Sequence, residues 1–199
     1  MQKDDNYLKI LGIAYLLLGT IALVNGINVN VSHILWYSYI AMFIIGVGLL
    51  RKNSFALSSQ LNILFFPYLI WNIDFFYQLI ISKPLFGITN YFFIQGPLIG
   101  KIVAFQHVFT IPILLYALYK IKVNRKDAWK LSFLIVTLLY IITRTFTPSE
   151  LNINCTFESC LPLINAGNLY PLVWFGILFF TIALTHYLIL KLPFFKKSK

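Results

Sequence analysis

Six long apolar runs follow one another along the chain, and they restrict its fold more than any other feature. The hydrocarbon core of a bilayer is about 30 Å thick, so a helix that crosses it needs about 20 apolar residues. The runs are apolar on all sides rather than alternating with polar residues, which favours helices over membrane strands. We therefore expect an all-α, polytopic integral membrane protein. Its six transmembrane helices are expected at approximately 8–26, 34–50, 57–82, 101–122, 131–147 and 170–190.

The composition agrees with this class of protein. Hydrophobic residues make up 59% of the sequence and charged residues 11%, which leaves too little polar surface for a water-soluble globule. The connections between the runs are short, so we expect a single membrane domain over 1–199. The first run follows two lysines, as a secretory signal would, but it is long and lacks a cleavage site of small residues. We expect it to remain as the first span.

The positive charges predict the orientation in the membrane. With six spans, 13 of the 16 lysines and arginines fall on the side that holds both termini. Cytoplasmic segments are enriched in such residues, so we expect a multi-pass cell-membrane protein with cytoplasmic termini. The basic face is expected to contact anionic lipid headgroups and not nucleic acid. Its residues are Lys3, Lys9, Arg51, Lys52, Lys120, Lys122, Arg125, Lys126, Lys130, Lys191, Lys196, Lys197 and Lys199, against Lys83, Lys101 and Arg144 on the other side.

The two cysteines lie close together in 152-NINCTFESC-160. The topology places this segment outside the cytoplasm, where thiols tend to be oxidised, so we expect a disulfide between Cys155 and Cys160. Free thiols and a metal or redox role are the alternatives. A zinc site needs four ligands, and only Glu150, Glu158 and His33 are plausible additions on that face. We therefore predict no metal site, and no motif indicates a cofactor.

Polar residues interrupt three of the predicted spans. Asp74 lies within 70-IWNIDFFYQL-79, where an ionised side chain at mid-helix costs about 2.5 to 3.5 kcal/mol and usually faces a bundle interior. Helical spacing places Asp74 on one face with Trp71 and Gln78. A second polar stripe on the fifth run includes Tyr140 and Arg144, and the fourth run carries His107.

The depths of these groups match. At 1.5 Å per residue, Asp74, His107 and Arg144 lie roughly 13, 9 and 6 Å inside the extracytoplasmic end of their helix. We therefore predict a polar pocket in the outer half of the bilayer, in which Asp74 pairs with Arg144. The connection 83–101, rich in aromatic residues, is predicted to lie in the interface or to dip over this pocket. The candidate binding residues are Asn72, Asp74, Gln78, His107, Arg144, Asn152 and Asn154.

Three classes of function are compatible with these residues. A protein that binds, and in one version transports, a small solute or lipid headgroup would use the pocket directly, and its size suggests a homodimer or a larger membrane complex. An enzyme acting on a lipid or isoprenoid would use His107 as acid or base, with Asp74 as a second catalytic candidate. An accessory subunit would use the same residues only to fix helix packing. The common hydrolase and phosphate-binding motifs are absent, and we rank the binding role first.

Overall fold

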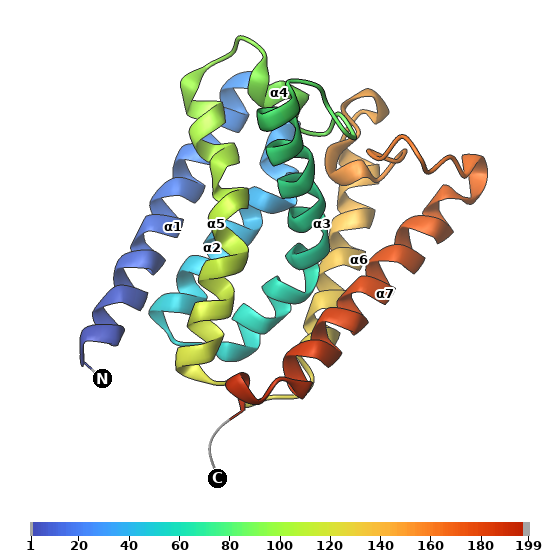
Figure 1. Cartoon of the computed structure of the whole chain (residues 1–199). Coiled ribbons are helices and arrows are strands. Elements are labelled where there is room, and N and C mark those ends of the chain that lie inside the picture. Colours follow the sequence, from blue (N-terminus) through green and yellow to red (C-terminus); the bar gives the residue numbers. More distant parts are fainter. Residues whose placement is uncertain (1, 197–199) are drawn as a thin grey trace.

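The chain folds into a bundle of helices (Figure 1), seen here in a computed structural model that describes residues 2–196. Within that range there are no strands. The helices are α1 (Gln2–Val29), α2 (Tyr37–Leu50), α3 (Ser54–Ile81), α4 (Asn90–Phe93), α5 (Leu98–Ile121), α6 (Ala128–Phe146) and α7 (Tyr170–Lys191). Short 3-10 turns complete the fold, among them η1 (Val31–Leu35) and η5 (Pro193–Phe195).

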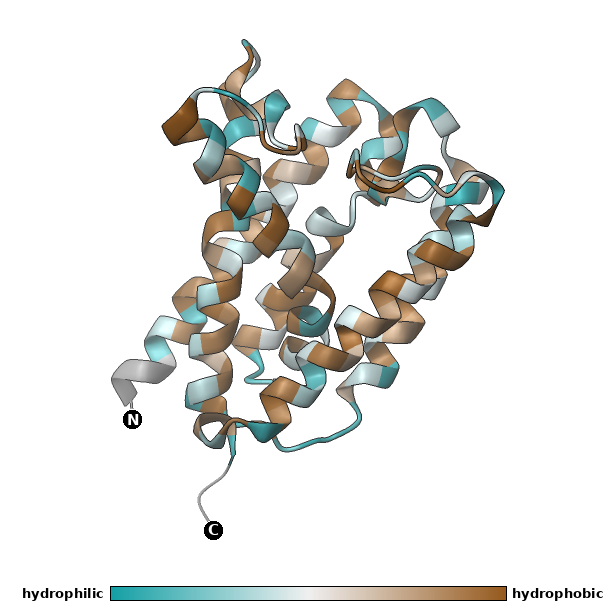
Figure 2. Ribbon diagram, turned by 45° about the vertical axis from the view of Figure 1, so that its right-hand side comes forward, coloured by the Kyte–Doolittle hydropathy of each residue, from teal (hydrophilic) through white to brown (hydrophobic). Residues whose placement is uncertain are grey.

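Five of these helices are long and apolar enough to cross a membrane, namely α1, α3, α5, α6 and α7. Their apolar residues run along the helices, and polar residues gather near the ends and in the connections (Figure 2). The sixth predicted span, 34–50, is not confirmed as one. Its helix, α2, has 14 residues and is about 21 Å long at 1.5 Å per residue. It begins only after Trp36, whose extended ψ of 120° separates it from η1.

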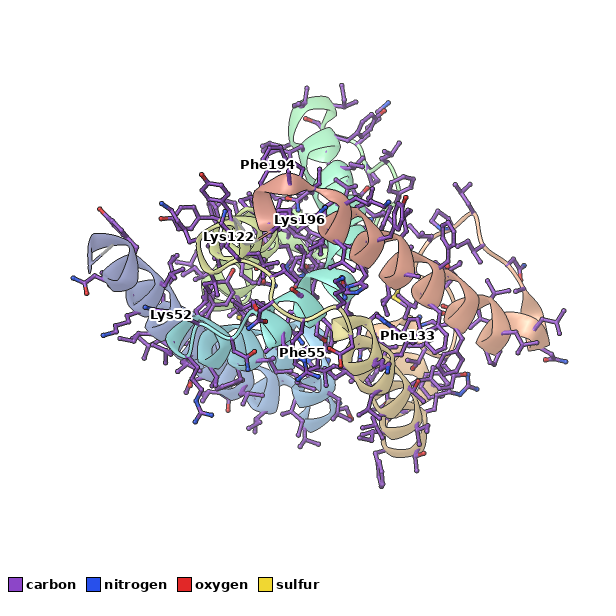
Figure 3. All side chains as sticks on the ribbon, turned by 90° about the horizontal axis from the view of Figure 1, so that it is seen from below. Lys52, Phe55, Lys122, Phe133, Phe194 and Lys196 are labelled. Carbon is purple, nitrogen blue, oxygen red and sulfur yellow. A yellow bond between two sulfur atoms is a disulfide. The ribbon has the colours of Figure 1, made fainter. Side chains whose placement is uncertain are left out.

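The two described ends of the chain lie at the same end of the bundle, at the bottom of Figure 1. This end also holds the α2–α3 and α5–α6 connections, and we call it the basic end because lysines gather there. Figure 3 views it directly and shows Lys52, Lys122 and Lys196, which come from three separate segments. The opposite end, the loop end, holds η1, α4 and the segment between α6 and α7.

Helix α3 lies at the centre of the bundle, in contact with α2, α5, α6 and α7. Its first half is buried on every side, from Leu57 to Leu64. Helix α1 packs outside, against α2 and α5. The approach of α1 to α2 requires glycine, because a Cβ atom on Gly12 would lie 2.9 Å from the carbonyl oxygen of Gly46. These close contacts hold α2 in the bundle although it is short.

Two connections cover the loop end. One, residues 82–97, contains α4 and joins α3 to α5. The other joins α6 to α7 and contains the disulfide between Cys155 and Cys160, as predicted, with Cα atoms 5.5 Å apart. Three non-glycine residues of this second connection, Asn152, Asn154 and Cys155, have positive φ values. The chain therefore turns sharply here, and the disulfide closes the turn.

Candidate functional site: a cavity at the loop end

A cavity of about 690 Å³ opens between the helices toward the loop end. Exposed residues on its walls, such as Pro67, Gly96 and Pro97, show that it is open to the surroundings. Its walls are mainly apolar and rich in aromatic rings. The aromatic residues that line it are Trp36, Tyr37, Tyr39, Tyr68, Trp71, Tyr91 and Trp174. Its volume lies within the range of about 300 to 1,000 Å³ that is usual for ligand pockets.

His107 on α5 lines this cavity, and its hydrogen bonds show which ring nitrogen carries the hydrogen. Its Nδ1 atom lies 2.6 Å from the carbonyl oxygen of Ala104. A carbonyl oxygen only accepts, so Nδ1 carries the hydrogen, and Nε2 has a lone pair. Among the described residues Nε2 has no hydrogen-bond partner. The ring stacks on Trp71, with centroids 4.7 Å apart, and contacts Tyr68 at 4.3 Å.

A buried chain of hydrogen bonds supports this corner of the cavity. Tyr15 on α1 donates to Thr110, whose hydroxyl lies 2.6 Å from Oε1 of Gln106. The amide of Gln106 in turn donates to the hydroxyl of Tyr68 at 2.9 Å. These hydrogen bonds join α1, α5 and α3. They therefore fix the position of Tyr68, whose ring contacts His107. These groups are neutral, so they add polarity without a buried charge.

Lys101 supplies the cation of the cavity wall. Its Nζ atom lies 6.0 Å from the centroid of the Phe92 ring. No carboxylate pairs with it among the side chains that the structure describes; Arg125 and Asp127 form an ion pair at the basic end. His33 also lines the cavity, and partial burial lowers its pKa below the ordinary value, which disfavours its charged form. The cavity wall therefore carries a positive charge that no acidic side chain balances.

Asp74 does not line the cavity and does not pair with Arg144. Its Oδ1 atom accepts hydrogen bonds from the backbone N–H groups of Leu85, Phe86 and Gly87, at 3.1, 2.6 and 3.2 Å. Its Oδ2 atom accepts from the amide and the hydroxyl of Thr89, at 2.8 and 2.7 Å. The predicted ion pair is therefore wrong. Five donors from the 82–97 connection satisfy the buried carboxylate instead, and they tie this connection to α3.

Arg144 is exposed and lies on the opposite flank of the loop end. Its guanidinium donates to the carbonyl oxygen of Thr156 and to the hydroxyl of Tyr140, both at 3.0 Å. It also lies over the ring of Phe157, 4.9 Å from the centroid. Arg144 thus holds the disulfide-bearing connection against α6. Depth along a helix, on which the predicted pair relied, does not show the direction in which a side chain points.

The two asparagines of this connection have different surroundings. Asn152 accepts from the backbone N–H groups of Phe157 and Glu158, at 3.0 and 3.2 Å, and shapes the turn. Asn154 lines the cavity. Its side chain accepts from the backbone N–H of Tyr37 at 2.8 Å and donates to the carbonyl oxygen of Leu35 at 2.8 Å. Asn154 thereby joins the α6–α7 connection to the start of α2.

Asn72 and Gln78, the two remaining candidates, stabilise the packing around α3. The Asn72 amide donates to the carbonyl oxygens of Tyr68 and His107, at 2.7 and 2.9 Å, and so links α3 to α5. Gln78 accepts from the hydroxyl of Thr89 at 3.2 Å. Of the seven candidate binding residues, His107 and Asn154 are brought together on the cavity wall, whereas Asn72, Asp74, Gln78, Arg144 and Asn152 lie outside its lining.

Comparison with family models, with curated proteins and with solved structures found no match for this chain. Among the residues that the structure describes, no three histidine, cysteine, aspartate or glutamate side chains are grouped so that they could hold a metal ion.

Sequence reasoning missed the aromatic wall of the cavity. Trp36, Tyr37 and Tyr39 come from a short connection and the start of α2, where aromatic residues are common at a membrane interface in any case. The sequence pattern places Trp71 on one helical face with Asp74 and Gln78, but it gives no indication that the Trp71 ring forms part of an aromatic wall. Only the folded bundle shows that these rings, from α2, α3, α4 and α7, enclose one space.

Proposed function

We propose that this membrane protein binds an amphipathic small molecule in the cavity at the loop end. The observation that carries the proposal is the combination, in one cavity of about 690 Å³, of aromatic walls with the free Nε2 of His107 and the cation of Lys101. Ligand pockets are typically apolar with a few convergent polar groups, which fix the orientation of the ligand. Transport of the bound molecule is one version of this role.

The chemistry of the walls indicates the class of ligand. Stacked rings such as Trp71 favour a flat or unsaturated apolar body, and the lone pair of His107 Nε2 accepts from a hydroxyl or an amine. The unbalanced charge of Lys101 favours an anionic or strongly dipolar headgroup. A lipid or isoprenoid-like molecule with a polar head combines these properties.

The proposed orientation places the basic end in the cytoplasm and the cavity in the outer half of the cell membrane. The charge distribution supports this arrangement, because positive residues gather on the cytoplasmic side of membrane proteins. Exposed basic side chains such as Arg51, Lys126 and Lys130 would then contact anionic headgroups of the inner leaflet. The extracellular or periplasmic side would have access to the open side of the cavity.

Analysis of the molecules that copurify with the protein tests the proposal. Protein extracted from its native membrane should carry one class of amphiphile enriched over the bulk lipid, identified by mass spectrometry of a solvent extract. His107→Ala should lower its amount, whereas Thr145→Ala, an exposed change on α6, should not. An extract with the composition of the bulk membrane for all three proteins would contradict the proposal.

An enzymatic role is a second candidate, favoured by the same free nitrogen. A neutral imidazole whose Nδ1–H is held by a carbonyl group has Nε2 available as a general base, as in many enzymes that activate a hydroxyl or water. The substrate would again be a lipid-like molecule in the cavity. A copurifying molecule that is covalently altered by the wild-type protein but unaltered by His107→Gln would favour this role over simple binding.

A further inference from the structure

A second group of polar side chains lies inside the bundle, between the cavity and the basic end. We call Ser58, Ser59, Asn62, Ser132 and His186 the inner polar cluster; each is at most 6% exposed. The Ser132 hydroxyl donates to the carbonyl oxygen of Ser59 at 3.1 Å. The Asn62 amide lies 3.3 Å from the Ser132 hydroxyl and 3.4 Å from Nδ1 of His186. The cluster therefore joins α3, α6 and α7.

This cluster reaches the surface of the basic end through His186. Its Nε2 atom lies 2.9 Å from the carbonyl oxygen of Lys126, an exposed residue of the α5–α6 connection. Because a carbonyl oxygen only accepts, Nε2 carries the hydrogen and Nδ1 is the acceptor. The imidazole thus has a donor side toward the surface and an acceptor side toward Asn62. A group with these two sides can pass a proton between them.

The upper boundary of the cluster is one apolar layer below the cavity. On α6, Val136 lines the cavity and Ser132 lies one turn away, about 6 Å at 1.5 Å per residue. On α3, Ile63 lines the cavity and directly follows Asn62. On α7, the fully buried Ile182 lies between the cavity residue Leu178 and His186. We call Ile63, Val136 and Ile182 the apolar layer.

Several buried polar atoms on this part of α3 lack a protein partner. They are Ser58 Oγ, Gln60 Nε2 and Asn62 Oδ1, in residues that are at most 1% exposed. A buried polar atom without a hydrogen bond costs about 1 to 3 kcal/mol, and buried water commonly removes this cost. Ser58 and Asn62 are four residues apart and share a face of the helix. Both observations indicate that the inner polar cluster holds water.

Gln60 adds a polar connection that begins at the cavity itself. The hydroxyl of Tyr37, a cavity residue, donates to Oε1 of Gln60 at 2.6 Å. Gln60 is fully buried and adjacent in sequence to Ser59, which belongs to the cluster. A hydrogen bond thus links a cavity residue to the turn of α3 that carries part of the inner polar cluster.

We propose that the inner polar cluster is the inner half of a proton pathway that joins the cavity to the basic end, with the apolar layer as its gate. Hydroxyl and imidazole groups together with water can relay protons, and every member of the inner polar cluster is buried. A proton arriving at Nδ1 of His186 makes the ring cationic, and the Nε2 proton then leaves to water at the Lys126 connection. Loss of the Nε2 proton leaves the ring neutral, with its hydrogen on Nδ1. Rotation of the ring about its side-chain bonds then turns a nitrogen lone pair back toward Asn62, so that the next proton can be accepted.

A proton pathway is a property separate from ligand binding, and it can be measured without knowing the ligand. Intramembrane histidines and polar side chains commonly mark proton relays in pumps and transporters. The pathway would supply protons to the cavity as a coupling ion. A proton-coupled carrier needs such a supply, whereas a passive binding protein does not. Its test can be made with protons alone.

Proton flux through purified protein in liposomes tests the pathway. The vesicles contain a pH-sensitive dye, and a potassium gradient with valinomycin drives protons inward. Val136→Ser places a hydroxyl in the apolar layer one turn from Ser132, and several-fold faster acidification than with the wild-type protein is expected. Leu138→Ser, the same type of change at an exposed position on α6, is the matched control and should leave the rate unchanged.

Adding His186→Leu to Val136→Ser should return the rate to that of the control, because the relay to the surface is then broken. Ile182→Ser opens the same layer from α7 and gives an independent variant should Val136→Ser fold poorly. Melting temperature and size-exclusion profile establish that each variant is folded. Equal rates for folded layer variants and Leu138→Ser, or a fast rate that persists with His186→Leu, would overturn the proposal.

Discussion

Thr89 binds the carboxylate of Asp74 through two atoms: its amide nitrogen lies 2.8 Å and its hydroxyl oxygen 2.7 Å from Oδ2. The other carboxylate oxygen accepts three more backbone N–H groups from the same connection. Asp74 is thus the anchor of the 82–97 connection, which contributes Ile88 and Tyr91 to the cavity wall. A charged side chain inside a predicted span is accounted for by these five donors.

Asp74→Asn should lower the melting temperature in detergent. Hydrogen bonds to a charged group contribute about 1.5 to 3 kcal/mol each, and an asparagine amide would point N–H groups at N–H donors. A net loss of about 3 kcal/mol would correspond to roughly 6 to 12 °C for a chain of this size. Thr89→Val, which removes only the hydroxyl, should cause a smaller loss. An unchanged melting temperature for Asp74→Asn would show that the anchor contributes nothing to stability.

Asp74 and Arg144 should behave as independent residues in a double-mutant cycle. They share no hydrogen-bond partner, so the losses from Asp74→Asn and Arg144→Gln should add to within about 0.5 kcal/mol. The free energies of unfolding of the two single variants and the double variant are compared. Partial recovery of stability in the double variant would instead indicate an ion pair between the two side chains.

The two native cysteines should be unreactive until reduced. Cys155 and Cys160 form a disulfide, so protein that is denatured without reductant should not react with a maleimide, and two thiols should appear after reduction. Mass spectrometry counts the added labels. Labelling of freshly purified, unreduced protein would show that the connection between α6 and α7 is not closed in this way.

Engineered cysteines can test the proposed orientation because both native cysteines are in the disulfide. Lys126→Cys at the basic end should be protected from an impermeant maleimide applied to intact cells, and Lys83→Cys near the end of α3 should react. Both positions are exposed. After the cells are permeabilised, both should react equally, which controls for local reactivity. The opposite pattern in intact cells would reverse the orientation and place the cavity on the cytoplasmic side.

The sequence was a good guide to the helices and a poor one to the side-chain partners. Long apolar runs predict spans because a bilayer requires them, and α1, α3, α5, α6 and α7 appear where the runs are. The run 34–50 was predicted as a sixth span because its apolar residues continue through Trp36. At Trp36, however, the backbone leaves the helical conformation, so α2 begins only at Tyr37. Apolar composition does not reveal such a break.

The partners of Asp74 show why the site was harder to predict. Its donors are backbone N–H groups of a connecting segment, which every sequence has and which only a folded loop brings together. His107 lines the cavity, but its importance depends on the stacking with Trp71 and on the space beside it. Neither the stacking nor the space is visible in a linear pattern.

The most direct test of the central claim is to fill the cavity and measure whether ligand is lost. Gly100 lines the cavity and has no atom within 4 Å of an added Cβ, so Gly100→Trp should fill space without a backbone clash. Gly176 on α7 is equally unobstructed but lies outside the cavity lining, which makes Gly176→Trp the matched control. Native mass spectrometry of the three proteins, extracted from the same membrane, should show a bound amphiphile on the wild-type protein and on Gly176→Trp, and little or none on Gly100→Trp. Equal occupancy of the two tryptophan variants, or no bound amphiphile on the wild-type protein, would contradict the account.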